Sequence, residues 1–363
     1  MKKLMFVLAC VLAISACKKE SKNEVREEDK QIIKIGAALP MSGGNAALGA
    51  SLKAGILAAI EDKSKEGLKY RYEAVFENNQ MLVGQTATAA LKLINIDDVN
   101  MLLTFTTGNG RVAAKIADDL KMLHVCATLE DENAKPMGMT TFFQGPTVQS
   151  YQKLMLKALE KQNVKKLALL AGNVGVACSG SEQLAELLKS KGIDAEVQCF
   201  NPSDRDFRFA IRNYILKGFD NFYIQFFPPQ TDILIRQLKE NNVAENHIFG
   251  SGIDTGTDVS VFEGINHIGG NSGTPKFINR LMEEYKIDNV YMAAASYDLI
   301  SLAIDAFENA QDVHNVYDLV GYFKAHATRP CMSGECRLLD NGFIANEAEW
   351  RTYKNGKPVA FRD

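Results

Sequence analysis

The first residues that could contribute to chemistry are Ser42 and Gly43, in a turn that follows the apolar run 32–38. That run has the length and the β-branched content of a buried strand, and Pro40 and the glycines after it end the strand. A helix is expected next, because apolar residues recur at helical spacing over 47–62. This is the first half of a βαβ unit, in which small ligands usually bind beyond the carboxyl ends of the strands. Ser42 and Gly43 are therefore candidate ligand-binding residues, although the turn could equally serve only as a connection.

The sequence lacks the common catalytic and nucleotide-binding motifs. It contains no phosphate-binding loop, no HExxH helix, no nucleophile elbow and no CxxC pair. The glycines of 250–256 do not have the spacing of a dinucleotide-binding turn. The histidines are scattered and are expected to be structural; they are His124, His247, His267, His314 and His326. We therefore expect no enzymatic activity, no metal site and no cofactor.

Strand-like and helix-like segments alternate along the chain, which indicates parallel sheets with helices on both faces. Strands are expected at 70–76, 101–105, 123–127, 141–144, 166–171, 195–200, 221–227 and 247–250. Helices are expected at 85–96, 111–120, 148–162, 182–191, 206–216, 231–241, 275–286, 292–309 and 315–326. Asn-Gly turns in the C-terminal segment indicate hairpins. Because the alternation restarts after Gly145, two doubly wound, Rossmann-like sheets fit this α/β chain better than one oversized sheet.

The composition is that of a globular protein without an excess of basic residues. The chain has 363 residues, of which 46% are hydrophobic, and a net charge of −3. Most of this length exceeds what one core usually holds, so two lobes are the default expectation. No patch combines Lys and Arg with aromatic residues, so nucleic acid is not an expected partner.

The N-terminus resembles a bacterial lipoprotein signal peptide. Lys2 and Lys3 precede a short apolar run at 4–13, and small residues then lead to Cys17. The apolar run is shorter than the roughly 20 residues that span a bilayer. Cleavage before Cys17 and lipidation of its thiol are therefore expected rather than a short membrane anchor, and the charged segment 18–31 is typical of a disordered tether. The protein is expected to be anchored to a membrane by its lipid, facing the periplasm or the cell exterior.

The remaining cysteines suggest a disulfide-bonded exported protein. Cys331 and Cys336 are close enough in sequence to join the two ends of a turn, although such a pair could also belong to a metal site. Cys178 and Cys199 could pair if the fold brings them together. Cys126 would then remain a free, buried thiol.

With these features, the chain resembles the periplasmic solute-binding proteins of the leucine, isoleucine and valine binding family. The resemblance rests on segments in a fixed order: IKIGAALPMSGG, LLTFTTGNGRVAAKIA, FFQGPTVQSYQKLMLKALEKQNVKKLALL, AASYDLISLAIDAF and SGECRLLDNGF. It implies a type I periplasmic binding fold, in which two α/β lobes joined by three hinge crossings close on a small ligand. The crossings are expected near Gly145, at 264–274 and at 326–334. The expected divisions are 1–16 for the signal peptide, 17–31 for the lipidated cysteine and tether, 32–146 with 273–327 for lobe 1, and 147–272 with 328–363 for lobe 2.

The resemblance also implies ligand-binding residues in lobe 1. Family members bind the carboxylate of an amino acid with hydroxyl and backbone N–H groups, and Thr106, Thr107 and Gly108 resemble one such loop. The next loop contains Thr128 but departs from the family in its acidic residues 130–132. We therefore expect this loop to bind an anionic ligand group less favourably. As an alternative, these threonines could simply cap helices.

Two residues of lobe 2 are implied in the same way. Phe227 aligns with a family aromatic residue that packs on the ligand, and Asp254 aligns with an acid that pairs with the ligand's ammonium group. The structural alternatives are that Phe227 belongs to the core and that Asp254 caps a helix.

These observations predict a monomeric, extracytoplasmic lipoprotein that binds a small polar ligand, an amino acid or an amide-like compound. The ligand would be delivered to an ABC permease. The alternative is the same fold without transport, as a ligand sensor or as an envelope-assembly lipoprotein that works through protein contacts. Neighbouring genes for permeases and ATPases would favour transport, whereas a neighbouring kinase or cell-wall synthase would favour the alternative.

Overall fold

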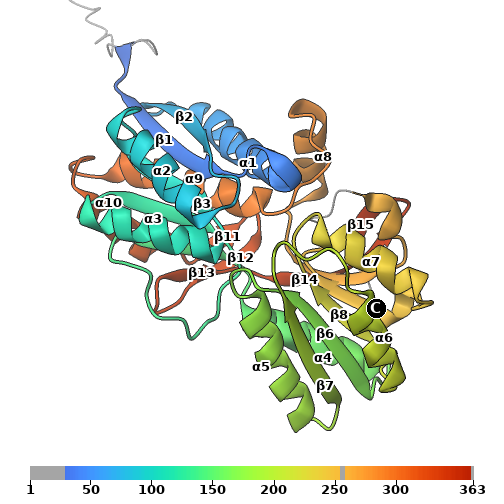
Figure 1. The fold of residues 1–363 in the computed structure, drawn as a ribbon. Coiled ribbons are helices and arrows are strands. Elements are labelled where there is room, and N and C mark those ends of the chain that lie inside the picture. The colour runs from blue at the N-terminus through green and yellow to red at the C-terminus, as the bar shows by residue number, and fades with distance from the viewer. Residues whose placement is uncertain (1–28, 254–257, 361–363) are drawn as a thin grey trace, which may run out of the picture.

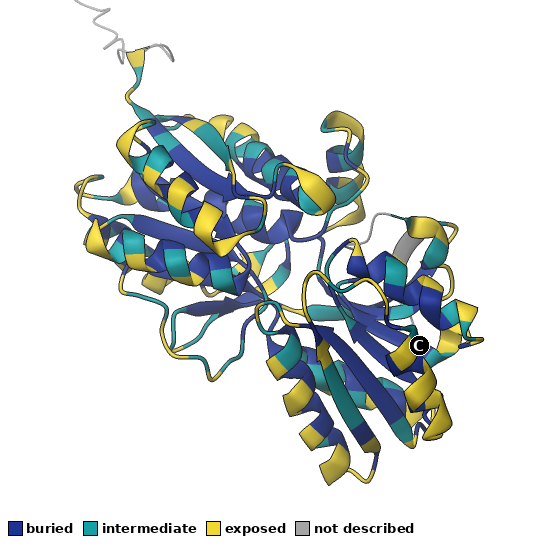
Figure 2. Ribbon diagram, in the orientation of Figure 1, coloured by how far each residue is buried: buried dark blue, intermediate teal, exposed yellow. Residues whose placement is uncertain are grey.

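The computed structural model describes residues 29–253 and 258–360, which form two α/β lobes (Figure 1). Each lobe contains one sheet with helices packed on it. Buried residues concentrate in the sheets, and exposed residues lie on the outer faces of the helices (Figure 2). Within 29–253 and 258–360, no helix is both long enough and apolar enough to cross a membrane. The predicted fold class of two doubly wound lobes is confirmed.

Lobe 1 is built on an eight-stranded sheet with the strand order β11-β12-β13-β5-β4-β3-β1-β2. Its strands are parallel except β12, which runs antiparallel to both of its neighbours. The strands are β1 (Ile32–Leu39), β2 (Arg71–Asn78), β3 (Met101–Phe105), β4 (Leu123–Ala127), β5 (Thr141–Gly145), β11 (Arg329–Cys331), β12 (Gly334–Leu338) and β13 (Phe343–Ala345). The helices are η2 (Gly43–Asn45), α1 (Ala46–Ser64), α2 (Val83–Asn95), α3 (Thr107–Asp119), α8 (Pro275–Glu284), α9 (Ala293–Asn309) and α10 (Val316–His326).

The central strands of lobe 1 are apolar throughout because successive side chains face two different helix layers. Leu103 packs in the cluster that contains α1, α9 and α10, whereas Leu102 packs against α2. The helices α1 and α9 approach closely at Gly55, where a Cβ atom would lie 2.2 Å from the backbone oxygen of Ala293. Glycine at this position therefore sets how closely the two helices pack.

Lobe 2 is built on a seven-stranded sheet with the strand order β15-β14-β10-β9-β8-β6-β7. Its core has the same two-layer arrangement: Leu169 packs with α4 and α5, and Leu170 packs with α6 and α7. The strands are β6 (Lys166–Gly172), β7 (Asp194–Phe200), β8 (Phe222–Gln225), β9 (Ile248–Ser251), β10 (Asn266–Gly270), β14 (Ala348–Lys354) and β15 (Lys357–Ala360). The helices are α4 (Val148–Lys161), α5 (Ala177–Ser190), α6 (Arg208–Leu216), α7 (Gln230–Glu240), η3 (Glu245–His247) and η5 (Val259–Val261).

The chain passes between the lobes three times, at crossing 1 (146–147), crossing 2 (271–274) and crossing 3 (346–347). The expected third crossing at 326–334 and the assignment of all of 328–363 to lobe 2 are wrong. Strand β13 pairs in parallel with β5, with Phe343 opposite Phe143, so the hairpin strands before crossing 3 complete the sheet of lobe 1. The expected second crossing, 264–274, is longer than the observed one, because Asn266–Gly270 within it form β10.

The turn 332–334 between β11 and β12 lies against all three crossings. Its backbone N–H groups donate to the buried carboxylate of Asp298 at 2.7 and 2.9 Å. Gln144, which precedes crossing 1, donates its amide to the same carboxylate at 3.3 Å. Gly273 of crossing 2 and Glu347 of crossing 3 lie beside this turn. The turn therefore connects the hinge segments through one buried carboxylate.

The cysteines outside the N-terminal segment form two disulfides. Cys178 at the start of α5 is bonded to Cys199 in β7, and Cys331 is bonded to Cys336 around the turn 332–334. Cys126 in β4 is free and buried. Cys17 lies outside the described residues, so its expected lipidation has no structural counterpart here.

Candidate functional site

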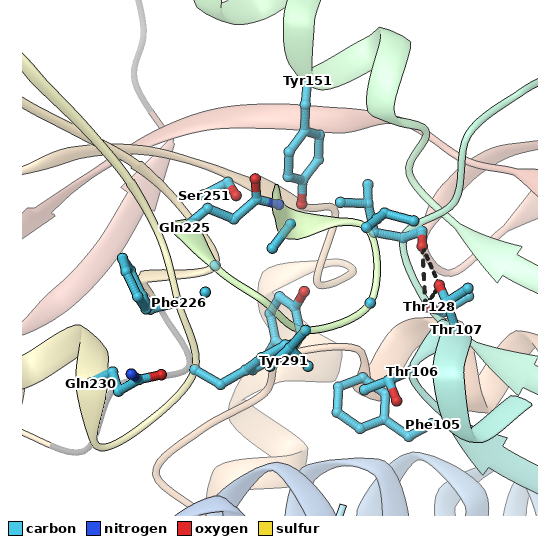
Figure 3. Close-up of a pocket in the computed structure, with 18 residues that line it drawn as sticks. Phe105, Thr106, Thr107, Thr128, Tyr151, Gln225, Phe226, Gln230, Ser251 and Tyr291 are labelled. Atoms are coloured by element: carbon cyan, nitrogen blue, oxygen red, sulfur yellow. Dashed lines mark hydrogen bonds between the residues drawn. The ribbon is translucent and has the colours of Figure 1, made fainter. Parts of the chain in front are cut away.

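A cavity lies between the lobes, and both lobes contribute to its wall (Figure 3). Lobe 1 contributes residues at the ends of β3 and β4 and the segment before α9. Lobe 2 contributes the ends of β6, β8 and β9 and residues of α4, α5 and α7. The space between the lobes amounts to about 660 Å³ when its opening to solvent is included. Its position at strand ends is the one that doubly wound folds use for ligands.

Threonines form the polar part of the lobe 1 wall. Thr107 begins α3, directly after β3, and Thr128 follows β4. The hydroxyl of Thr107 donates to the backbone oxygen of Leu129 at 2.9 Å and lies 3.0 Å from the hydroxyl of Thr128. The hydroxyl of Thr128 also lies 3.2 Å from that backbone oxygen. Both hydroxyl hydrogens are thus used within the loop, which leaves their lone pairs and the N–H groups at the start of α3 for a ligand.

Two residues of this wall region have backbone conformations that non-glycine residues rarely adopt. Thr106 has a φ of +73°, and Met292, next to the lining residue Tyr291, has a φ of +59°. Each costs about 1–3 kcal/mol, and such strain concentrates at functional sites. Thr106 is held by hydrogen bonds on both sides: its N–H donates to Ala127 at 3.2 Å and its oxygen accepts from Gly110 at 2.8 Å. Both strained residues flank the same cavity.

Aromatic rings form the apolar part of the cavity. Phe227 of lobe 2 meets Phe105 of lobe 1 edge to face, with ring centroids 6.3 Å apart and an interplanar angle of 84°. Phe105 makes a second edge contact with Tyr291, at 6.4 Å and 78°. Phe226 and Tyr151 complete the aromatic lining from lobe 2. Such rings bind flat or branched apolar groups, and the Phe105–Phe227 pair also connects the two lobes.

None of the described residues that line the cavity is charged. The acidic loop between β4 and β5 is used elsewhere: Asp131 accepts from Gln149 at 2.7 Å and from Gln183 at 2.9 Å, both in lobe 2. Burial raises the pKa of Glu130, whose carboxylate lies 3.3 Å from Arg111. Asp131 thus connects the lobes, and none of the acidic residues 130–132 lines the cavity.

The structure brings some of the expected site residues together and leaves others outside. Gly108 lies within α3 and does not line the cavity. Ser42 and Gly43 are exposed, and Ser42 accepts a hydrogen bond from Asn78 at 2.7 Å. Asp254 lies outside the described residues. The expected residues that do line the cavity are Thr106, Thr107, Thr128 and Phe227.

The turn after β1 contacts lobe 2 at a different place. A Cβ atom on Gly44 would lie 3.4 Å from the Pro229 side chain of lobe 2. In lobe 1 the cavity lies over the ends of β3 and β4, and β1 is one strand further from β4 than β3 is. The turn therefore faces the other lobe without reaching the cavity.

Sequence reasoning missed several lining residues. Gln225 is the last residue of β8 and Gln230 is the first residue of α7, so the strand-end rule could have found both. Tyr151 lies within α4 and Tyr291 precedes α9, and neither directly follows a strand. Their positions depend on how the helices pack across the hinge, for which the sequence pattern gives no signal.

Two buried histidines and the free cysteine are structural. His124 contacts the hydroxyls of Thr104 at 2.8 Å and Thr141 at 3.2 Å, and burial lowers the pKa of His124 to about 3. Burial, together with the nearby Arg351, lowers the pKa of His267 to about 3. Burial raises the pKa of the Cys126 thiol to about 12. All three groups are uncharged near neutral pH and lie outside the cavity wall.

A cavity between two doubly wound lobes, lined at the strand ends of both, defines a two-lobed ligand-binding protein. The sequence matches the family of periplasmic binding proteins over residues 32–319, and the chain belongs to this family. The members of this class bind solutes, and the expectation of a solute-binding protein agrees with it at this level. No curated protein sequence matches the chain.

The fold is similar to solved structures of solute-binding proteins. A leucine binding protein, LivK, from Thermotoga maritima has a TM-score of 0.80 and 18% identity over 91% of this chain and 98% of that one. LivJ from Streptococcus pneumoniae, in complex with isoleucine, has a TM-score of 0.76 and 19% identity over 91% and 98%. A solute binding protein of an ABC transporter from R. palustris, in complex with benzoate, has a TM-score of 0.76 and 17% identity over 91% and 95%. At these identities the similarity concerns the fold.

Proposed function

We propose that the protein captures a small solute between its lobes and delivers it to an ABC importer. The observation that carries this proposal is the shared cavity, because a ligand inside it contacts residues of both lobes at once. Such a ligand favours the closed arrangement of the lobes over the open one by its differential contacts. The permease then recognises the closed form.

The ligand is an amino acid or an amide-like compound. Its acceptor group lies at the start of α3, where free N–H groups and the helix dipole favour a carboxylate or a carbonyl. The hydroxyls of Thr107 and Thr128 can accept hydrogen bonds only from a donor group of the ligand, because their own hydrogens are used within the loop. The apolar part of the ligand lies among Phe105, Phe227 and Tyr291. For an amino acid, Asp254 pairs with the ammonium group, as the family resemblance implies.

The protein acts as a monomeric lipoprotein on the outer side of a membrane. Lipidated Cys17 holds it there, and the charged tether separates the lobes from the membrane surface. Labelling of the cells with a radioactive fatty acid should label the wild-type protein but not a Cys17→Ser variant. Label that persists in this variant would contradict the lipid anchor.

A thermal-shift screen tests the binding proposal on the full-length protein in mild detergent, against amino acids, amides and small carboxylates. A ligand at a hundred times its Kd adds about 2.7 kcal/mol of stability, which is readily detected. Thr107→Val should weaken the shift, whereas the same change at Thr88, which is exposed on α2, should leave it unchanged. A screen in which no compound raises the melting temperature would count against the proposal.

Asp254→Ala separates the two ligand classes. It should abolish the shift produced by amino acids and spare that of amides without an ammonium group. An amino acid that still stabilises the variant fully would remove Asp254 from the site.

A further inference from the structure

The orientation of the Gln230 side-chain amide in the cavity wall is fixed by backbone groups outside the cavity. Its amide nitrogen donates to the backbone oxygens of Asn201 at 2.8 Å and of Asp204 at 3.0 Å. A carbonyl can only accept, so this amide cannot be turned around without losing both bonds. The Oε1 atom of Gln230 is the one left for a ligand, and it points toward the cavity in Figure 3. A ligand group at this point must donate a hydrogen bond.

The amide of Gln225 is oriented the other way in the structure, with its oxygen toward two hydroxyl groups. Its Oε1 accepts from the hydroxyl of Ser181 at 3.4 Å and from the hydroxyl of Tyr223 at 3.3 Å, and neither residue lines the cavity. Among the residues that the structure describes, no acceptor receives a hydrogen bond from its Nε2, which in Figure 3 lies on the side of the Tyr151 hydroxyl. In this orientation two N–H hydrogens of Gln225 remain for a ligand, so a ligand group at this point accepts a hydrogen bond.

A charged group fits this wall poorly. A carboxylate could accept a hydrogen bond from Gln225 but has no hydrogen to donate to Gln230. An ammonium group could donate to Gln230 but cannot accept from Gln225. The described residues of the wall supply no counter-charge for either, and Asp254, the partner proposed above for an ammonium group, lies outside them. Burying an unpaired charge costs more than burying a hydrogen-bonded neutral group. A primary carboxamide has both an acceptor and a donor and no charge.

We propose that Gln225 and Gln230 make the site selective for solutes that carry an uncharged carboxamide group at the lobe 2 end of the cavity. The carboxamide oxygen accepts from Gln225, and its N–H group donates to Gln230. The apolar body of the solute then lies against the aromatic rings. This inference rests on the proposed solute-binding function and adds the chemical group that lobe 2 recognises.

Calorimetric titration of the full-length protein with three compounds of nearly identical shape tests the selectivity. Benzamide offers a donor and an acceptor, benzoate only acceptors, and benzamidinium only donors. Benzamide should bind more tightly than either of the others by about tenfold or more, because each mismatch leaves one buried partner unpaired. Isovaleramide and isovalerate repeat the comparison without an aromatic ring.

The variant Gln225→Glu reverses the polarity of one contact without changing its shape. Its carboxylate still accepts from Ser181 and Tyr223 but faces the cavity as an acceptor, so the preference should move from benzamide to benzamidinium. The matched control is Gln311→Glu, an identical chemical change at an exposed residue between α9 and α10. It should preserve the wild-type order. If the Gln225→Glu variant does not fold, Ser181→Ala can be used instead. It removes one hydrogen bond that orients Gln225 without altering the cavity wall, and it should reduce the ratio of the affinity for benzamide to the affinities for the two charged compounds.

The possible results distinguish a failure of the carboxamide selectivity from a failure of the proposed solute-binding function. Tighter binding of benzoate than of benzamide, or the same order of affinities in Gln225→Glu and wild type, would overturn the carboxamide selectivity alone. Binding of other solutes but of no carboxamide would do the same. A protein that binds no solute in either the thermal or the calorimetric assay would overturn the proposed function as well.

Discussion

The free energy of unfolding should fall when the pH is lowered from about 7.5 to about 5.5, because each lobe contains a buried neutral histidine. The folded-state pKa values of His124 and His267 are both about 3, whereas a histidine in an unfolded chain has a pKa of about 6.5. Below that value the unfolded chain takes up protons that the folded protein does not. The stability is therefore fully present above about pH 6.5 and is lost as the pH falls toward 3.

The size of the loss follows from the same pKa values. For one histidine the loss is RT ln(1 + 10^(pKa,unfolded − pH)) as long as the pH stays well above the folded pKa. It is about 1.4 kcal/mol at pH 5.5 and close to zero at pH 7.5. His124 and His267 together thus remove about 2.8 kcal/mol over this interval.

Urea unfolding at the two pH values measures this loss, and His267→Phe isolates one half of it. Phenylalanine keeps a ring beside Tyr353, whose centroid lies 5.3 Å from that of His267, but cannot bind a proton. Trp350 is the only tryptophan of the chain and lies in β14 of lobe 2, as does His267 in β10. Its fluorescence therefore reports on the lobe that contains the substitution.

The pH-dependent loss should be smaller by about 1.4 kcal/mol in His267→Phe than in wild type. Comparing the His267→Phe variant with wild type removes the contribution of every other titrating group to the pH-dependent loss of stability. His124→Gln should give a reduction of the same size when unfolding is followed by circular dichroism. A His267→Phe chain that loses as much stability as wild type would refute the reasoning.

Three further variants, one of them a double substitution, test the hinge. Asp298→Asn should lower the free energy of unfolding by about 2–4 kcal/mol, because its amide nitrogen would face backbone N–H donors that now bind a carboxylate; urea unfolding that matches wild type would contradict this role. Gly145→Ala would place a Cβ atom 1.7 Å from a backbone oxygen, so the yield of folded protein should collapse, whereas Gly84→Ala meets nothing within 4 Å and should fold normally. Replacing Cys331 and Cys336 with serine should cost about 2 kcal/mol in the same unfolding assay, and no change would show that the turn does not need its disulfide.

The sequence predicted the elements of the fold because apolar periodicity is strong in both lobes. The run 101–105 is apolar on both sides, and its residues do face two helix layers. The strand-end rule then led to Thr107 and Thr128, whose loops follow adjacent strands. The same rule failed for Ser42, because only the strands nearest the cleft place their turns at the cavity. Which strands those are depends on the sheet order, and local patterns do not contain it.

The third crossing could not be predicted for a related reason. Strand β13 has only three residues, and its partner β5 lies about two hundred residues earlier in the chain. A short apolar segment such as Phe343 to Ala345 fits either sheet equally well by its periodicity. The choice is made by the open edge of β5, which exists only in the folded lobe.

The late position of these strands has a consequence for how the protein is made. Strand β13 covers the edge of β5 in one lobe, and β14 covers the edge of β10 in the other. Until residues 329–360 have left the ribosome, each lobe therefore has a core strand with one bare edge. Neither sheet can be completed before these residues are synthesised, which delays stable folding and exposes both edges to other proteins.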